Sequence, residues 1–559
     1  MSRKKAADRL IYLPLGGAGE IGMNAYVYGY GLPGKEKLIV VDLGVTFPDM
    51  DTTPGVDLIM PDITWLKKRR ADIVGIFITH AHEDHVGAIG HYWASLGAPV
   101  YARKFTANIA RRKLAEHGHP DSVVTVVDAY PHMIDCAPFK VSYVPISHSI
   151  PESAGLIIDS PEGRVLHSGD FKIDETPVVG DAFNRALWED VSKDGVKALV
   201  CDSTNVFSTA PGRSESTIGD AIAEMMSEAK GTVVATTFAS NIARLKTLAM
   251  AAQKANRSVV LLGRSMRRMV EAATETGILT SFPAVVSPED ALNMPRNAIM
   301  LLVTGSQGER RAASAQLAQG KYLGLSLKEG DTFLFSSKTI PGNERGVIRI
   351  MNQLSELGVD VIDDAGGKYH VSGHANRPDL VTLHEIVKPQ ILIPMHGEHR
   401  HLREHVKLGA ERGLTGIVAV NGMMIDLSGN APTVAEYIDT GRTYLDGSVK
   451  YGAMDGIVRD RIRMAMNGQM IVTLIMDEND DPLGDPWVEI SGLAETGISD
   501  SALVDVVEAD LAQFIGRAQP KTLRDDVKLE KELKHIARKS AQGEIGKKPE
   551  VIVIVSRLS

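Results

Sequence analysis

The stretch ADIVGIFITHAHEDH, residues 71–85, decides the fold. Its first nine residues are largely apolar and rich in β-branched side chains, as in a strand buried in a sheet. The strand candidate stops at His80, and the six residues from there to His85 carry three imidazoles and two carboxylates. Such groups are rarely buried without partners, so their density at a strand end indicates a functional cluster rather than a polar turn.

The spacing within HAHEDH suits two metal ions. Side chains at i and i+2 of a strand point the same way, so His80 and His82 are able to bind one ion together. The following residues VGAIGHYWASLG, 86–97, have a helical pattern. A turn from strand to helix would direct Asp84 and His85 elsewhere, toward a second ion.

Three distant residues strengthen this prediction, because each ends another strand candidate. They are His148 in ISHS, Asp170 in GRVLHSGD and His396 in ILIPMHGE. Each alone is equally typical of a cap or of a core side chain. Two sites sharing one aspartate would leave positions open for water, which is the catalytic rather than the structural arrangement. We therefore expect the metal ligands to be His80, His82, Asp84, His85, His148, Asp170 and His396.

The composition is that of a soluble globular protein, with 44% hydrophobic and 23% charged residues among 559. Only two cysteines are present, so a disulfide framework or a thiolate zinc cluster is excluded and a reducing cytoplasm is expected. We find no signal-peptide pattern and no apolar run long enough for a membrane span. The net charge of −9 argues against a non-specific nucleic-acid coat protein, but not against a nuclease with a basic groove.

The rhythm of the chain changes twice. Short strand candidates fill the first 200 residues, strand–helix alternation begins near 215, and the first pattern returns after about 355. Alternation predicts a parallel sheet, so the middle segment is expected to be an α/β domain inserted into the first one. The predicted boundaries are 1–214 and 355–430 for the two parts of the first domain, 215–354 for the insertion, 431–460 for a linker and 461–559 for a C-terminal domain.

A glycine-rich stretch, Gly17-Ala-Gly19-Glu-Ile-Gly22, matches the dinucleotide-binding pattern GxGxxG. That pattern needs a helix directly after it. The residues that follow, MNAYVYGYGLPGKEKLIVVD, instead form two strand candidates around a Gly-Pro turn. A dinucleotide site is therefore not expected.

The order Asp42, His80-x-His82-x-Asp84-His85, His148, Asp170 resembles the metallo-β-lactamase superfamily. Three further motifs, CDSTN with Asp202, HVSGH with His374 and PMHGE with His396, resemble the β-CASP nucleases of that superfamily. The longer stretches LPLGGAGEIGMN, FPDMDTTPGVDLIMPDITWL, TTFASNIAR, GRSM, VTGSQGE and TIPGNE are similar to the ribonuclease J family, and the similarity extends from about residue 9 through the C-terminal domain.

The resemblance implies an α/β fold: a metallo-β-lactamase αββα sandwich, an inserted β-CASP α/β domain and a small α+β C-terminal domain. It implies a zinc-dependent ribonuclease with two Zn²⁺ per subunit and with Mn²⁺ or Mg²⁺ as substitutes. Its activity would be 5′-to-3′ exonucleolytic on single-stranded RNA with a 5′-monophosphate, and also endonucleolytic. Roles in rRNA processing and mRNA decay in the cytoplasm, a homodimer or homotetramer, and contacts with other RNA-decay proteins are implied as well.

Individual roles follow from the same resemblance. Asp202 and His374 are expected to transfer protons. Substrate phosphate is expected to lie against Phe238, Ala239, Ser240, His370, Val371, Ser372, Gly373 and His374. Ser240 stands directly before a helix candidate, so an N-cap is the alternative for it. Asp42 is expected either to orient a ligand histidine or to cap the end of a strand.

Two other functions stay open from the sequence. A small-molecule hydrolase of the same fold would not need the long segment between Asp170 and His396, so that segment favours a polymer substrate. DNA-directed β-CASP nucleases typically carry valine where this chain has His396, which favours RNA. A non-catalytic RNA-binding subunit would be expected to have lost ligands, and none is lost.

Overall fold

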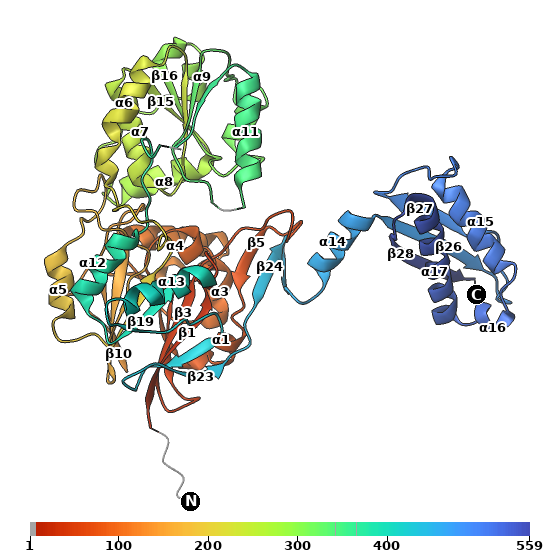
Figure 1. The fold of residues 1–559 in the computed structure, drawn as a ribbon, viewed down its shortest axis with the longest axis horizontal. Coiled ribbons are helices and arrows are strands. Elements are labelled where there is room, and N and C mark those ends of the chain that lie inside the picture. Colours follow the sequence, from red (N-terminus) through yellow and green to blue (C-terminus); the bar gives the residue numbers. More distant parts are fainter. Residues whose placement is uncertain (1–6, 341, 365, 559) are drawn as a thin grey trace, which may run out of the picture. The chain divides into compact units, whose positions relative to one another are not determined.

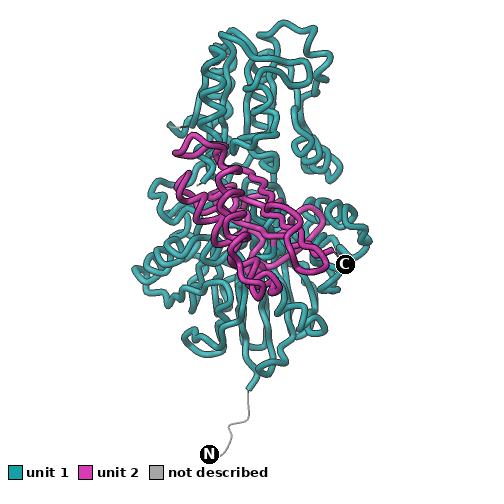
Figure 2. The backbone as a smooth tube through the Cα atoms, turned by 90° about the vertical axis from the view of Figure 1, so that its right-hand side faces the viewer, with its two compact units in different colours: residues 1–47, 58–443 teal, residues 48–57, 444–559 magenta. Residues whose placement is uncertain are grey.

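The computed structural model describes residues 7–340, 342–364 and 366–558. The chain divides into two compact units, which Figure 2 shows in different colours. The larger unit comprises Met1–Phe47 and Leu58–Thr443, and the smaller one comprises Pro48–Asp57 and Tyr444–Ser559. No helix of the described residues combines the length and the apolar character that crossing a membrane requires.

Two sheets form the base of the larger unit. The first has eight strands in the order β23-β22-β1-β3-β4-β6-β7-β8. They are β1 (Arg9–Gly16), β3 (Ala25–Gly31), β4 (Lys37–Val41), β6 (Ile73–Ile78), β7 (Val100–Ala102), β8 (Val124–Val126), β22 (Met423–Asp426) and β23 (Thr433–Tyr437). The second has the order β21-β19-β13-β12-β11-β10-β9. Its strands are β9 (Ile134–Cys136), β10 (Phe139–Pro145), β11 (Ala154–Ser160), β12 (Gly163–His167), β13 (Ala198–Asp202), β19 (Ile391–Met395) and β21 (Thr415–Gly416).

The two sheets share one core, so they form a sandwich. Tyr12 and Tyr28 from the first sheet pack in the same buried cluster as Tyr143, Leu156 and Val200 from the second. A separate cluster covers the outer face of the second sheet with α5 (Arg185–Ser192), α12 (Arg377–Val387) and α13 (His399–Ala410). On the other side, α3 (Ile89–Leu96) contacts α4 (Lys104–Glu116), which contacts β7 and β8. The αββα sandwich expected from the sequence is confirmed.

The inserted domain lies in sequence between two strands that are neighbours in space. β13 and β19 pair in parallel, with Asp202 opposite Met395. The chain between them builds a parallel sheet of order β15-β16-β14-β17-β18, with helices on both faces (Figure 1). Its elements are β14 (Val233–Thr236), β15 (Ser258–Leu262), β16 (Ile299–Val303), β17 (Thr332–Phe335), β18 (Asp360–Ile362), α6 (Gly219–Glu228), α7 (Ile242–Lys254), α8 (Arg264–Glu275), α9 (Pro288–Ala291), α10 (Ala313–Ala318) and α11 (Glu344–Glu356).

The smaller unit has its own core on one face of a three-stranded sheet of order β27-β26-β28. Its elements are α14 (Ile457–Asn467), β26 (Gln469–Met476), β27 (Trp487–Ser491), α15 (Leu503–Ile515), α16 (Pro520–Leu523), α17 (Asp526–Ile545) and β28 (Glu550–Arg557). The segment expected as a linker also contains strands, namely β23, β24 (Arg442–Asp446) and β25 (Val449–Gly452).

Candidate active site

The site is built from the carboxyl ends of parallel strands. In the first sheet, β4 and β6 run parallel, and Asp42 and His80 follow their ends. In the second sheet, β12, β13 and β19 run parallel, and their ends are followed or formed by Asp170, Asp202 and His396. Because side chains at the carboxyl ends of neighbouring parallel strands meet at one edge, residues far apart in the sequence become neighbours.

One group of four residues brings three imidazoles and a carboxylate together. The ligand atoms of His80, His82, His148 and Asp170 all lie within 4.8 Å of one another. His82 Nδ1 is 3.1 Å from Nε2 of His80 and 3.1 Å from Nε2 of His148. Burial lowers the pKa of His82 to about 4 and the pKa values of His80 and His148 well below their usual range. Burial therefore favours the neutral imidazole, which is the form that binds a metal ion.

A second group combines two histidines with two carboxylates. Asp84, His85, Asp170 and His396 also have ligand atoms within 4.8 Å of one another. His85 Nε2 lies 3.2 Å from Asp170, and His396 Nε2 lies 3.1 Å from Asp84. Burial lowers the pKa of His85, but the carboxylates of Asp170, Asp84 and Asp42 outweigh it and raise this pKa to about 10. Asp170 belongs to both groups, and donors of this kind fit Zn²⁺.

Asp42 hydrogen-bonds the ring nitrogen of His85 that lies away from the candidate metal position. Its Oδ2 accepts a hydrogen bond from His85 Nδ1 at 2.8 Å, which leaves Nε2 to face Asp170. The same carboxylate accepts hydrogen bonds from the backbone N–H and the hydroxyl of Thr79, both at 2.8 Å. The two interpretations of Asp42 therefore both apply: it orients a candidate ligand and it caps the end of β6. Asp42 and His396 have φ of 63° and 49°, a left-handed conformation that costs a non-glycine residue about 1–3 kcal/mol.

Asp202 and His374 form a pair beside the second group. Oδ2 of Asp202 accepts a hydrogen bond from Nδ1 of His374 at 2.8 Å. These two residues, Asp170 and His396 have candidate ligand atoms within 4.8 Å of one another. The Asp202 side chain is 1% exposed, whereas that of His374 is 22% exposed. Burial lowers the pKa of His374, but the charge and hydrogen bond of Asp202 outweigh it and raise this pKa.

Two segments are expected to bind phosphate, and the second of them contains His374. Phe238, Ala239 and Ser240 are half-buried and lie in the turn before α7. Asn241, not Ser240, caps that helix, because its side chain accepts from the N–H of Arg244. The N-cap alternative for Ser240 is therefore wrong.

The second segment, residues 370–374, is fastened to candidate ligands. His148 Nδ1 donates to the carbonyl of Gly373 at 2.6 Å. Asn205 donates to the hydroxyl of Ser372 at 2.7 Å. His370 is half-buried, and burial together with nearby cations lowers its pKa to about 3. Val371 is buried.

Several supporting residues have only weak signals in the sequence. Asn24 donates from its backbone N–H to the carbonyl of Asp84 at 2.8 Å. Gly17 accepts from the N–H of His396 at 2.7 Å. The glycine-rich stretch therefore supports a candidate metal loop. It contains β2 (Ala18–Gly19) and is followed by β3, where a dinucleotide site needs a helix. The hydroxyl of Thr204 donates to Oδ1 of Asp202 at 2.7 Å. The one sequence signal for Thr204 is its place in the motif CDSTN.

A cluster behind the site has another explanation than metal binding. Cys201, His384 and His405 have ligand atoms within 4.8 Å of one another and are buried. The two imidazole rings are tilted by only 16°, and their Nε2 atoms are 3.0 Å apart. Nearly coplanar rings with facing nitrogens make an N–H···N hydrogen bond. We therefore interpret this cluster as a histidine–histidine hydrogen bond within the core.

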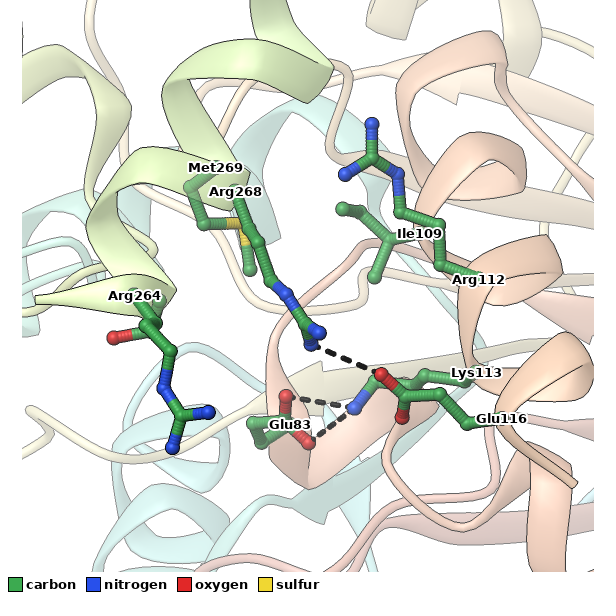
Figure 3. A pocket seen from close by; sticks show the side chains of 9 residues that line it. Glu83, Ile109, Arg112, Lys113, Glu116, Arg264, Arg268 and Met269 are labelled. Atoms are coloured by element: carbon green, nitrogen blue, oxygen red, sulfur yellow. Dashed lines mark hydrogen bonds and ion pairs between the residues drawn. The ribbon is translucent and has the colours of Figure 1, made fainter.

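A cleft of about 560 Å³ lies between α4 and α8. It reaches Glu83, which stands between two candidate ligands, and Figure 3 shows Lys113 paired with Glu83 and Arg268 paired with Glu116. Lys113 Nζ is 2.7 Å from both carboxylate oxygens of Glu83. Arg264 also lines the cleft, so it and Arg268 face one space.

Comparisons with known proteins agree with this architecture. The metallo-β-lactamase superfamily model matches residues 18–203, and the ribonuclease J β-CASP domain model matches residues 230–354. The RNA specificity domain of Zn-dependent metallo-hydrolases matches residues 367–419, and the ribonuclease J C-terminal domain matches residues 456–558.

Curated relatives match over most of their length. A ribonuclease J from Sinorhizobium meliloti is 39% identical over 99% of this chain and 98% of its own. A ribonuclease J from Corynebacterium glutamicum is 33% identical over 88% of this chain and 68% of its own. Among solved structures, a protein of unknown function from Enterococcus faecalis aligns with a TM-score of 0.52 at 14% identity, covering 75% of this chain and all of its own. That last likeness concerns the fold alone.

Proposed function

The chain belongs to the ribonuclease J family of metal-dependent ribonucleases, and we propose that it holds two Zn²⁺ ions and digests single-stranded RNA in the 5′-to-3′ direction. In this proposal it prefers a 5′-monophosphate end and also cuts internally. The observation that carries the proposal is the pair of histidine–carboxylate groups that share Asp170. Roles in RNA maturation and mRNA decay belong to the same proposal.

The donor set supports zinc. His80, His82, His148 and Asp170 would hold one ion, and Asp84, His85, His396 and Asp170 the other. Imidazole and carboxylate are common zinc ligands, and Mn²⁺ or Mg²⁺ would serve as substitutes where carboxylates dominate. When bound, such ions supply positive charge that polarises a phosphodiester and eases deprotonation of an attacking water.

The chain's own residues would handle the proton of the leaving group. Nδ1 of His374 is engaged by Asp202 at 2.8 Å, so Nε2 is the nitrogen left to exchange a proton with substrate. A 3′-oxygen that leaves with negative charge needs such a proton. Asp202 would hold the ring in place, since its own Oδ1 accepts from Thr204. His374 is thus proposed as the general acid and Asp202 as the residue that orients it.

A phosphate pocket would give the enzyme its 5′ preference. Residues 238–240 precede the first turn of α7, where the positive end of the helix dipole attracts an anion. His370, Ser372 and His374 would add donors from the second segment. A monophosphate in this pocket would place the first linkage over the metal ions, whereas a triphosphate would be too bulky. Ser240→Ala combined with Ser372→Ala should reduce release of mononucleotides more than internal cleavage of a structured RNA, and equal losses would reject the pocket.

A substrate comparison separates this proposal from its alternatives. RNA with a 5′-monophosphate, the same RNA with a 5′-triphosphate, and single-stranded DNA of the same sequence are digested side by side. Faster digestion of the monophosphorylated RNA is expected, and equal digestion of DNA would favour a DNA-directed nuclease. The match to an RNA specificity domain supports RNA, and the inserted domain argues against a small-molecule hydrolase.

Assembly and location complete the proposal. The uncovered face of the sheet in the smaller unit carries Ile552 and Ile554, 48% and 46% exposed, beside Ile471 on β26. β28 is an edge strand, and apolar edge strands tend to associate. We propose a homodimer or homotetramer formed through this unit, with other RNA-decay proteins as further partners. Two free cysteines suit a reducing cytoplasm.

A further inference from the structure

Arg244 is a fully buried cation in the first turn of α7, four residues after Ser240. A guanidinium has five N–H donors, and each of those of Arg244 has an acceptor. Nε and Nη2 donate to the two carboxylate oxygens of Glu215 at 2.6 and 2.9 Å. Nη1 donates to the carbonyl and the hydroxyl of Ser336 at 2.7 and 3.1 Å. The remaining N–H of Nη2 donates to the carbonyl of Val371 at 3.2 Å.

These contacts join the two halves of the proposed phosphate pocket. Arg244 belongs to the helix whose start carries residues 238–240, and Val371 belongs to the segment 370–374. The hydroxyl of Ser336 donates onward to the carbonyl of Tyr369 at 2.7 Å, so the chain is held both at Val371 and at the residue directly before the second segment.

The positive charge of Arg244 is paired with a carboxylate inside the protein. Glu215 is 3% exposed and forms a bidentate ion pair with it, so the guanidinium is neutralised before any substrate arrives. A lysine has three donors on a point charge and is unable to satisfy five acceptors arranged around a planar fork. The geometry of this contact therefore requires arginine, and its role is to fix distances rather than to bind phosphate.

We propose that Arg244 is a positioning residue that sets the spacing between residues 238–240 and residues 370–374 and thereby the preference for a 5′-monophosphate. The inference rests on the proposed function. It goes further by assigning the discrimination of RNA ends to a buried side chain that does not touch RNA. A purely structural tie would instead affect every activity of the enzyme alike.

The chain offers a matched control in Arg257. This arginine is also buried, 5% exposed, and lies in the same inserted domain. Its guanidinium donates to the backbone carbonyls of Met226, Gly231, Ala229 and Ile299, none of which belongs to either pocket segment. Arg257→Lys therefore removes a comparable set of buried hydrogen bonds without changing the pocket.

The test compares Arg244→Lys, Arg257→Lys and the unmodified full-length chain, all loaded with zinc. KM and kcat are measured on a single-stranded RNA with a 5′-monophosphate and on the same RNA with a 5′-hydroxyl. Cleavage of a circular RNA reports internal cutting without any 5′ end. In Arg244→Lys we expect KM for the monophosphorylated RNA to rise about tenfold, which corresponds to about 1.4 kcal/mol. The rate of circular-RNA cleavage should change about tenfold less than this KM. In Arg257→Lys, the ratio of KM for the 5′-monophosphate RNA to KM for the 5′-hydroxyl RNA should equal that of the unmodified chain.

The outcomes distinguish the positioning role from a purely structural one. Equal losses on all three RNAs in Arg244→Lys, or the same change of ratio in Arg257→Lys, overturn the positioning role. If the unmodified chain itself does not distinguish the two 5′ ends, the proposed 5′ preference fails, and this inference falls with it. If Arg244→Lys does not fold, Ser336→Ala removes one acceptor and the link to Tyr369, and the same shift in the ratio is required of it.

Discussion

Nδ1 of His85 lies 2.8 Å from Oδ2 of Asp42, and both side chains are wholly buried. The contact keeps a proton on Nδ1 of His85 and turns Nε2 toward Asp170 at 3.2 Å. A carboxylate behind a ligand histidine also raises the basicity of that ligand. The binding of one proposed ion would therefore depend on a residue outside its ligand group.

The first prediction concerns that contact. Asp42→Asn keeps the size of the side chain but removes its negative charge, so zinc affinity should fall by roughly 10–100-fold. Competition with a chelator measures the affinity, and circular dichroism of the zinc-loaded variant checks the fold. Unchanged affinity in a folded variant would contradict the role given to Asp42.

Gly44 gives a prediction about close packing. A Cβ at this position would lie 1.6 Å from the carbonyl oxygen of Asp84 and 2.8 Å from the backbone N of Asn24. Gly44→Ala must therefore displace the loop that carries Asp84 and His85, and we expect RNA hydrolysis to fall by about 100-fold or more, as for an active-site displacement of about 1 Å. The loss of activity is measured as the steady-state rate of RNA hydrolysis at saturating zinc.

The control is Gly543→Ala in α17, where a Cβ meets no atom within 4 Å. This variant should retain activity and gain up to about 1 kcal/mol of helix stability. Similar activity losses in the two glycine variants would show that the Asp84 loop is not the cause.

His374 yields the third prediction. Because His374 is proposed as the proton donor, His374→Gln should reduce the rate of hydrolysis by about 10²–10⁴-fold. Metal content should stay at the level of the unmodified protein, since the two groups proposed to hold zinc do not include His374, which belongs to a third group with Asp170, Asp202 and His396. An RNA whose 3′-oxygen leaving group is replaced by sulfur needs less protonation and should be hydrolysed with a smaller loss. Equal losses on both substrates would argue against proton donation.

The smaller unit allows a prediction about assembly. Deletion of residues 461–559 removes the edge strand β28 and the exposed side chains of Ile552 and Ile554. In sedimentation, the truncated protein should shift towards monomer relative to the full chain at the same concentration. A full-length chain that is already monomeric at micromolar concentration would refute assembly through this unit.

Much of the site is predictable because four of the candidate ligands follow strands. His80, His148, Asp170 and His396 each follow a run that is recognisable from its apolar pattern alone. The insertion is predictable for the same reason, since the strand–helix rhythm changes there. Both signals are local.

What the sequence does not reveal depends on partners far away in the chain. Arg244 reads as one charge on an amphipathic helix, and its burial depends on Glu215, Ser336 and Val371. Asn205 acquires its role only by meeting Ser372. His405 is separated from His384 by 21 residues, and only the packing of α12 on α13 brings their rings together. Tertiary contact decided these cases, and no local pattern encodes it.

Zinc content and RNA hydrolysis measured on the same samples test most directly whether the two groups around Asp170 are a catalytic metal centre. The unmodified protein should contain about two zinc ions per chain, as two four-ligand groups require. The double variant His80→Ala/Asp84→Ala should stay folded, lose metal and lose hydrolysis of monophosphorylated RNA by several orders of magnitude. Near-normal RNA cleavage by that variant, folded and free of metal, would contradict the two-metal centre.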